Sequence, residues 1–304
     1  MWTKRSHMRC VALAFLVALL LMGGCAQEAV PAKSELTFCP PLFGAGDFPK
    51  MRGPAQQLAD YVSRESGVKV GMFVPTDYGN TILGLKNGEY DIAYIPAGLF
   101  PKVEVDAGVT PVFLVTVDGK AKEDSAIYVK SGSSVQSLAD LRGKVVAAAD
   151  PFSASGWLVP AAELKKAGID PVSDISVNFR DVDADSIVEV LNDKADAAIA
   201  PTSALDDDKV AEAGGAGQLR ALQEFKDVPI GVIVFGKTVT RSQAAKLKTA
   251  FSGIEKSGAT GTNSDGDSVP LLGVVGWDGL KAAKSSDFKD LRERAQIIGM
   301  IPAK

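Results

Sequence analysis

Histidine is almost absent from this sequence of 304 residues: the only one is His7, close to the N-terminus. His7 falls within a segment that we expect to be removed, so the remaining chain cannot build a Ser-His-Asp triad, a Cys-His pair or a histidine metal site. Without histidine, the candidate catalytic pairs are Ser153 with Lys165 or Lys166, and these lysines lie beyond the following helix turns. We therefore predict a protein that is not an enzyme and that needs no metal or cofactor.

Cysteine is also scarce, with residues at positions 10, 25 and 39. The first falls in the removable segment and the second at its end, which leaves Cys39 and no intramolecular disulfide. Cys39 follows a short apolar strand, where either a reactive thiol or a small buried side chain is expected.

Basic charge is not in excess. The sequence has 33 Lys and Arg against 37 Asp and Glu, and loss of residues 1–24 removes three further basic residues. A mildly acidic chain with scattered charges lacks the basic face that nucleic-acid binding needs. We expect no nucleic-acid partner.

The N-terminus has the pattern of an export signal. Basic residues precede an apolar run over 11–22, and Gly23, Gly24 and Cys25 follow. The run is shorter than the roughly 18 residues that span a bilayer. The small pair before Cys25 resembles a bacterial lipobox, although Met22 stands where leucine is usual. The pattern predicts a signal peptide over 1–24, lipidation of Cys25 and a tether over 25–35. Ordinary secretion with cleavage elsewhere and a buried Cys25 are the alternatives.

From Leu36 onward, short apolar strands alternate with amphipathic helices. The first group has strands at 36–39, 68–74, 90–95 and 112–117, with helices at 54–66 and 78–87. The second group has strands at 126–129, 144–149, 175–179 and 195–200, with helices at 134–141, 156–166 and 185–191. A strand at 230–235 then leads to helices at 242–256 and 287–298, with no new sheet. This alternation is typical of βαβ units.

The pattern therefore predicts an α/β protein with two lobes, each a mainly parallel sheet flanked by helices. The first lobe is discontinuous, with residues 36–118 and 232–304, and residues 119–231 form the second lobe. Two crossing segments join them. A cleft is expected where the strands' carboxyl ends face each other, because such sheets bind ligands there.

The most informative loop is Ser153-Ala154-Ser155-Gly156, between a buried strand and a helix. Free N–H groups and the dipole of a helix start favour an anion, and two hydroxyls add donors. The serines can equally be simple helix caps. The loop lacks the Gly-Lys-Ser/Thr ending of a Walker P-loop, and it is not a Gly-x-Ser-x-Gly elbow.

The surrounding run at 137–170 reads SLADLRGKVVAAADPFSASGWLVPAAELKKAGID. It resembles the signature of the phosphate/phosphite/phosphonate substrate-binding proteins of ABC importers. Segments 67–78, 87–101 and 185–200 resemble other core segments of that family in the same order. The resemblance implies a type II periplasmic-binding-protein fold, a small anionic ligand, a monomer, and a permease with its ATPase as partners.

Carried over by position, the resemblance gives Ser153 and Ser155 the hydroxyl donors, with Ala154 in place of a family threonine. It implies that Tyr78 bonds the ligand from the first lobe, although Tyr78 can also simply pack at a helix start. Phe100 takes the place of a second family tyrosine as a wall without a hydroxyl. Trp157 stands at a bulky aromatic position and is either cleft wall or core.

Two positions depart from the family. Asp183 stands at the family histidine that contacts the oxyanion, and a carboxylate there repels a dianion. The ligand would then be monoanionic, carry a hydrogen-bond donor or come with a cation, unless Arg180 neutralises the site; Asp183 can also be a plain helix cap. Thr202 stands near a family acid that binds an ammonium group. It either donates a hydrogen bond or only starts a helix, and its presence favours ligands without an amine.

These observations predict an extracytoplasmic solute-binding lipoprotein of an ABC importer, in the periplasm or on the outer face of a bacterial membrane. The expected ligand is phosphite, phosphate or a simple phosphonate. A sensory lipoprotein that reports to a membrane receptor, or a divergent binder of a non-phosphorus molecule, would fit the same sequence.

Overall fold

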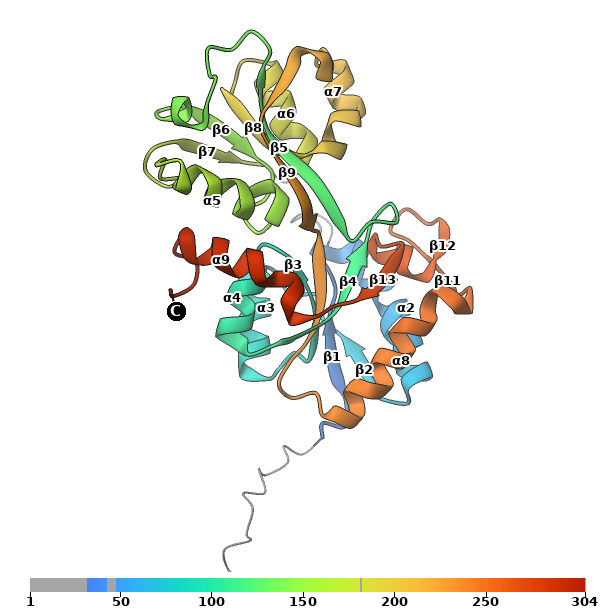
Figure 1. The fold of residues 1–304 in the computed structure, drawn as a ribbon. Coiled ribbons are helices and arrows are strands. Elements are labelled where there is room, and N and C mark those ends of the chain that lie inside the picture. The colour runs from blue at the N-terminus through green and yellow to red at the C-terminus, as the bar shows by residue number, and fades with distance from the viewer. Residues whose placement is uncertain (1–31, 43–47, 181, 304) are drawn as a thin grey trace, which may run out of the picture. The chain divides into compact units, whose positions relative to one another are not determined.

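The computed structural model describes residues 32–42, 48–180 and 182–303 (Figure 1). The predicted signal peptide, Cys25 and most of the tether lie outside the described residues. The chain divides into residues 1–32 and a compact unit over 33–304, to which the following description applies. In the described part of the chain, no helix is both long and apolar enough to cross a membrane.

Within the described residues, the first lobe is built on a six-stranded sheet in the order β13-β4-β10-β3-β1-β2. Its strands are β1 (Leu36–Cys39), β2 (Val70–Met72), β3 (Ile92–Pro96), β4 (Thr110–Thr116), β10 (Gly231–Phe235) and β13 (Gly279–Ala282). β1 pairs in parallel with β2 and β3, whereas β10 lies antiparallel between β3 and β4. β1 to β4 therefore all run in one direction, and β10 and β13 run against them.

The second lobe is built on a five-stranded sheet in the order β7-β6-β8-β5-β9, again among the described residues. Its strands are β5 (Lys122–Lys130), β6 (Val145–Ala148), β7 (Ser176–Phe179), β8 (Ala197–Pro201) and β9 (Leu219–Pro229). β6 is parallel to β7 and β8, and β5 is antiparallel to β8 and β9. β5 is thus the one strand of this sheet that runs in the opposite direction.

Two short segments connect the sheets. Residues 117–121 lead from β4 to β5, and Ile230 alone separates β9 from β10. The Ile230 N–H donates to the Ala121 carbonyl at 3.2 Å, and the Ile230 carbonyl accepts from the Ala97 N–H at 3.2 Å. The two crossing segments are therefore hydrogen-bonded to each other and to the first lobe.

Helices cover both faces of each sheet. They are α2 (Phe48–Ser66), α3 (Tyr78–Asn87), α4 (Phe100–Ala107), α5 (Val159–Lys166), α6 (Asp183–Leu191), α7 (Asp208–Glu212), α8 (Arg241–Ser257) and α9 (Lys289–Ile297). Side chains of α2 and α8 share one core with the first sheet, while α3, α4 and α9 pack on the other face. α6 and α7 cover one face of the second sheet, and α5 covers the other. Short turns complete the chain: η1 (Leu138–Leu141), η2 (Ala154–Leu158), η3 (Thr202–Asp206), η4 (Ala216–Gln218), η5 (Leu271–Val275) and η6 (Ser285–Phe288).

Helix α3 begins and ends where the sequence pattern predicts, because both ends are capped. The Asp77 carboxylate accepts from the Asn80 N–H at 2.8 Å, which satisfies one of the free donors at the start. Gly88 ends the helix with φ of 75°, a conformation that favours glycine. The two caps fix the position of Tyr78, the first residue of the helix.

Several predicted boundaries are wrong. The helix expected over 134–141 does not begin at Ser134; the turn η1 starts at Leu138 and is capped by Ser137. The helix expected over 156–166 is divided into the π-helical turn η2 and α5. The prediction of no new sheet after residue 235 is also wrong, because β11 (Thr260–Thr262) pairs with β12 (Ser268–Pro270), and β13 joins the first sheet.

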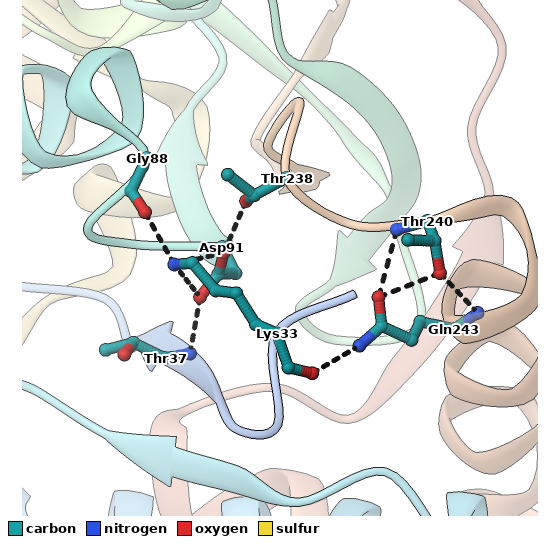
Figure 2. A network of polar contacts seen from close by, with 7 residues as sticks. All are labelled: Lys33, Thr37, Gly88, Asp91, Thr238, Thr240 and Gln243. Carbon is teal, nitrogen blue, oxygen red and sulfur yellow. Dashed lines mark hydrogen bonds and ion pairs between the residues drawn. The ribbon is translucent and has the colours of Figure 1, made fainter. Parts of the chain in front are cut away.

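A buried carboxylate holds the start of the folded body in place (Figure 2). Asp91 is fully buried and pairs with the Lys33 ammonium at 2.8 Å. The same carboxylate accepts from the Thr37 N–H at 2.8 Å and from the Thr238 hydroxyl. The Gln243 amide donates to the Lys33 carbonyl at 3.0 Å. These contacts therefore fix Lys33 close to the amino end of β1.

The C-terminal helix α9 contacts both lobes. Arg294 pairs with Glu163 on α5 of the second lobe at 2.5 Å. Arg292, two residues earlier, makes two hydrogen bonds to Glu104 on α4 of the first lobe at 2.5 and 2.7 Å. The helix therefore forms a third link between the lobes, in addition to the two crossing segments.

Candidate functional site

A cavity of about 320 Å³ lies between the two lobes. The first lobe contributes Pro41, Leu42, Tyr78, Tyr94, Pro96, Val115, Val117, Ile230, Gly276 and Trp277, and the second contributes Glu123, Ala149, Asp150, Ser153 and Asp183. Leu42 follows β1, Pro96 ends β3 and Ala149 follows β6, so the cavity lies at the carboxyl ends of parallel strands of both sheets. This is where such sheets bind ligands.

The serine turn is at the cavity, but its hydroxyls are already engaged. Ser153 lies before η2, and its Oγ accepts from the Gly156 N–H at 2.9 Å. The Ser153 and Ser155 hydroxyls are 3.1 Å apart, and the Ser155 hydroxyl donates to the Glu123 carboxylate. Ser155 is only 1% exposed. Ser153 both caps η2 and lines the cavity. Ser155 does not line the cavity, but its hydroxyl contacts two residues that do, Ser153 and Glu123.

Glu123 was not predicted as a site residue. It lies near the start of β5, immediately after the first crossing segment. Burial raises the pKa of the Glu123 carboxyl to about 7, and the nearby charge of Asp183 adds to the increase, while the Ser155 hydrogen bond acts in the opposite direction. In the sequence Glu123 is one of three consecutive charged residues, so nothing marks it as buried. A side chain of this kind changes its charge near neutral pH.

Asp183 lines the cavity, and it is the first residue of α6, not its cap. Val182 holds the cap position and makes no side-chain hydrogen bond there. Burial raises the pKa of the Asp183 carboxyl to about 6, with a further contribution from Asp150. Arg180 forms its ion pair with Glu189 on α6 and not with Asp183. The helix-cap alternative for Asp183 is therefore wrong.

Aromatic rings form the first-lobe side of the cavity. Tyr78 is 8% exposed, and its hydroxyl is hydrogen-bonded to the backbone of Leu42. The rings of Tyr94 and Trp277 lie 5.5 Å apart. Burial raises the pKa of both tyrosine hydroxyls, so they are neutral at physiological pH. Tyr78 was predicted here, whereas Tyr94 and Trp277 were not.

Gly98 lets the lobes approach closely beside the cavity. A Cβ atom at Gly98, between β3 and α4, would lie 2.5 Å from the carbonyl oxygens of Phe152 and Ser153 in the second lobe. Real Cβ atoms do not come this close to backbone, so this contact requires glycine. The serine turn is thus held directly against the first lobe.

Two predicted wall residues, Phe100 and Trp157, and the predicted hydrogen-bond donor Thr202 lie elsewhere. Phe100 is fully buried, and its ring lies 4.1 Å from that of Phe288, in the core beneath α9. Trp157 packs edge to face on Phe179 at 4.9 Å and does not line the cavity, so the core alternative holds for it. Thr202 lines a neighbouring hollow of about 610 Å³, which shares Glu123 with the cavity, and its hydroxyl donates to the Asp124 carbonyl at 3.3 Å.

Ala154 and Gly156 belong to the same turn but are buried behind Ser153, so any contact they make with a ligand would be through the backbone. Cys39 is also fully buried, and burial raises the pKa of its thiol, which keeps the thiol protonated. A reactive thiolate at this position is therefore disfavoured. Among residues 32–42, 48–180 and 182–303, no group of three Cys, His, Asp or Glu side chains is arranged to hold a metal ion.

Comparisons with known proteins point to one family. The family model described as "ABC transporter, phosphonate, periplasmic substrate-binding protein" matches residues 49–288. The phosphonates-binding periplasmic protein of Escherichia coli K12 is 25% identical over 240 residues, which cover 77% of this chain and 68% of that protein. The phosphate-import protein PhnD of Mycolicibacterium smegmatis is 23% identical over 322 aligned residues, with 97% of each chain covered.

The fold comparison agrees. The structure of PhnD1 from Prochlorococcus marinus in complex with methylphosphonate matches with a TM-score of 0.64 and 14% identity, covering 88% of this chain and 99% of that one. At this identity the likeness concerns the arrangement of strands and helices and not the ligand.

Proposed function

The chain belongs to the family of periplasmic substrate-binding proteins of phosphonate ABC transporters, and we propose that it captures its ligand in the cavity between the lobes and delivers it to the permease. The fold is that of a type II periplasmic binding protein. The observation that carries the proposal is the lining of the cavity, which comes from the carboxyl ends of strands in both sheets. A ligand there contacts both lobes and so favours their closed arrangement.

The closing motion that we propose moves residues 119–231 against residues 36–118 and 232–304. The crossing segments, α9 and the close contact of Gly98 with the serine turn would have to change, because these join the two lobes. A closed cleft carrying its ligand is the form that the permease and its ATPase would recognise. The relatives are transport proteins, and this function requires no catalytic step.

For the ligand we propose a small molecule with a phosphonate-type group. A volume of about 320 Å³ accommodates a molecule of few atoms. The oxyanion would lie at the start of η2, where the Ser153 hydroxyl and the backbone N–H groups of the turn are the donors. The Ser155 hydroxyl is held by Glu123, so it is not the main donor.

Calorimetry on the mature protein tests this proposal. Phosphate, phosphite, methylphosphonate, 2-aminoethylphosphonate and sulfate would be titrated into wild type, Tyr94→Ala and the control Tyr61→Phe, which lies on α2 away from the cavity. We expect at least one phosphorus compound to bind, and we expect Tyr94→Ala to weaken that binding at least tenfold while Tyr61→Phe leaves it unchanged. Binding that is insensitive to Tyr94→Ala would place the site elsewhere.

We also propose that the mature protein is a monomer anchored to the outer face of a bacterial membrane through lipid on Cys25. Supporting this are the basic residues, apolar run and Gly-Gly-Cys sequence of the N-terminus. Expression of Cys25→Ala should move the protein from the detergent-extracted membrane fraction to the soluble periplasmic fraction. An unchanged distribution would refute the anchor without affecting the ligand proposal.

A further inference from the structure

Basic side chains without an acidic partner gather at one end of the first sheet. β10 ends at Phe235, which lies opposite Ile92 at the start of β3 and Thr110 at the start of β4. The segment that follows β10 therefore lies at the amino ends of these two strands. Residues 236–254 contain no Asp or Glu but four basic residues, which are Lys237, Arg241, Lys246 and Lys248. All four are exposed, and in the described part of the chain none of them makes an ion pair.

A fifth basic residue, Lys86, lies at the same end of the lobe. Lys86 is in the last turn of α3, and Gly88 ends that helix. A Cβ atom at Gly88 would lie 2.8 Å from the methyl group of Thr238, so the end of α3 touches the segment that carries the other four. Lys86 is also exposed and makes no ion pair with any described residue. Lys86, Lys237, Arg241, Lys246 and Lys248 are called the basic face below.

Acidic residues at this end do not cancel the basic face. Asp91 is buried and pairs with Lys33 at 2.8 Å, and Glu35 pairs with Lys69 at 2.7 Å. Glu89 is exposed after α3 and offsets one of the five charges. The whole chain has 37 Asp and Glu against 33 Lys and Arg, three of which fall in residues 1–24. The basic face is therefore a local positive surface on an acidic protein.

The chain enters the folded body at the same end. Figure 2 shows the Lys33 ammonium donating to the Gly88 carbonyl at 2.5 Å, while the Gln243 amide donates to the Lys33 carbonyl at 3.0 Å. Lys33 follows Cys25 by eight residues, and at about 3.5 Å per residue the two are at most about 28 Å apart. This reach is shorter than the diameter of about 50 Å that a folded body of this size has. A lipid on Cys25 would therefore keep this end of the protein towards the bilayer.

We propose that the basic face binds the headgroups of anionic phospholipids and so orients the anchored protein on the membrane. The inference rests on the proposed lipid anchor, because the anchor determines which end of the protein meets the bilayer. Each Lys or Arg close to an anionic membrane increases binding about fivefold, and the attraction falls off within about 8 Å at physiological salt. The ligand cavity lies at the opposite, carboxyl ends of β1 and β3. In this orientation the cavity is turned away from the lipid and stays accessible to its ligand.

Sedimentation with phospholipid vesicles tests the inference. The mature chain without lipid, residues 26–304, would be mixed with vesicles of phosphatidylcholine alone or of phosphatidylcholine and phosphatidylglycerol in equal amounts. We expect binding to the anionic vesicles and not to the neutral ones, and we expect it to weaken as the salt concentration rises. Equal binding to both kinds of vesicle, or binding to neither, would overturn the inference.

Paired substitutions locate the binding surface. Lys237→Gln together with Arg241→Gln should weaken binding to the anionic vesicles about tenfold or more. The control pair, Lys194→Gln with Lys256→Gln, removes the same charge from exposed positions in the second lobe and at the other end of α8, about 22 Å from Arg241 along the helix. It should leave the binding unchanged. An equal loss in both pairs would show that the total charge, and not the basic face, causes the binding.

Inorganic phosphate distinguishes a membrane surface from a site for soluble anions. Added at constant ionic strength, it should leave the binding to anionic vesicles unchanged, because the lipid offers many headgroups to the whole face at once. Loss of vesicle binding on adding phosphate would mean that the basic face holds a single soluble anion, and the inference would be wrong.

A fluorescent label shows which end of the protein meets the lipid without removing any charge. Cys39 is buried, so a polarity-sensitive label can be attached to Ser242→Cys, next to Arg241 on α8, or to Ser131→Cys, directly after β5 in the second lobe. We expect anionic vesicles to shift the emission to shorter wavelength for the label on Ser242→Cys and not for the label on Ser131→Cys. The opposite result would overturn the inference.

Failure of this inference differs from failure of the proposed function. The vesicle experiments use a chain without lipid, whereas the anchor is tested by fractionating Cys25→Ala after a wash in high salt, and ligand capture is tested by calorimetry. If the anchor and ligand capture hold but anionic vesicles are not bound, this inference alone fails. If the vesicles are bound but Cys25→Ala does not change the distribution, the anchor fails and the basic face remains a membrane contact.

Discussion

The buried carboxyl of Glu123 should make the stability of the ligand-free protein depend on pH in a specific direction. Its pKa rises from an ordinary 4.5 to about 7 on folding, mainly through burial. Between these values the folded protein holds a proton that the unfolded chain has released. The free energy of unfolding therefore falls as pH rises through this window, and the stabilising contribution is fully present only below the lower value.

The size of the effect follows from the pKa. A tenfold change in proton affinity is worth about 1.4 kcal/mol, so the increase to about 7 corresponds to about 3 kcal/mol over the whole window. Between pH 5 and pH 8 most of that window is crossed, and we expect Glu123 to account for a loss of about 2 to 3 kcal/mol. Asp183, with a pKa of about 6, should add about 1 kcal/mol in the same direction.

Urea unfolding followed by circular dichroism at pH 5, 6, 7 and 8 measures this loss in wild type, Glu123→Gln and Glu212→Gln. Glutamine cannot titrate, so the first variant should lose about 2 to 3 kcal/mol less than wild type between pH 5 and pH 8. Glu212 is an exposed residue of α7, and its variant should follow the wild-type curve. If the free energy of unfolding changed with pH in the same way in Glu123→Gln and in wild type, the raised pKa of Glu123 would be refuted.

Three further substitutions test contacts outside the carboxylate pair. Asp91→Asn removes the buried charge beneath the start of β1 and should lower the free energy of unfolding by about 3 kcal/mol in urea. Gly98→Ala places a methyl group 2.5 Å from the Ser153 carbonyl oxygen, so ligand affinity measured by calorimetry should fall about tenfold as the lobes are kept apart. Arg294→Ala breaks the 2.5 Å pair with Glu163, and its urea midpoint should report a loss of about 2 kcal/mol.

Each of these substitutions has a counterpart in the chain that lacks the contact. Asp60→Asn removes a charge from the exposed side of α2, Gly53→Ala adds a methyl group with nothing within 4 Å, and Lys289→Ala removes an exposed charge from α9. Asp60→Asn and Lys289→Ala should stay near wild type in stability, and Gly53→Ala should keep the wild-type ligand affinity. If a control variant changed the stability or the ligand affinity as much as its test variant does, the contact removed in the test variant would not be the cause.

The sequence predicted correctly those elements whose ends depend on residues close by in the chain. Helix α3 was predicted at both ends because Asp77 and Gly88 are its caps. Strand β9 was missed because most of its residues are exposed or partly exposed and several are charged, and the strand forms by pairing with the distant β5. The turn at Ser153 was predicted for the same local reason as α3, since it lies between a strand and a helix.

The other site residues depend on contacts between distant segments. Glu123, Tyr94 and Trp277 meet at the cavity from three separate parts of the chain, and no local pattern distinguishes them from other acidic or aromatic residues. Phe100 was misplaced for the same reason. Its ring packs on Phe288, which lies on the returning C-terminal segment, and that contact exists only once the lobe is assembled.

The single residue between β9 and β10 has a mechanical consequence. Ile230 is hydrogen-bonded to Ala121 on the other crossing segment. The two segments therefore act as one hinge axis and not as two independent hinges. Atoms close to a hinge axis move little when a lobe rotates about it. Glu123 pairs in register with Val228, two residues from Ile230 and therefore close to this axis. Glu123 should therefore move little relative to the first lobe when the lobes close around a ligand.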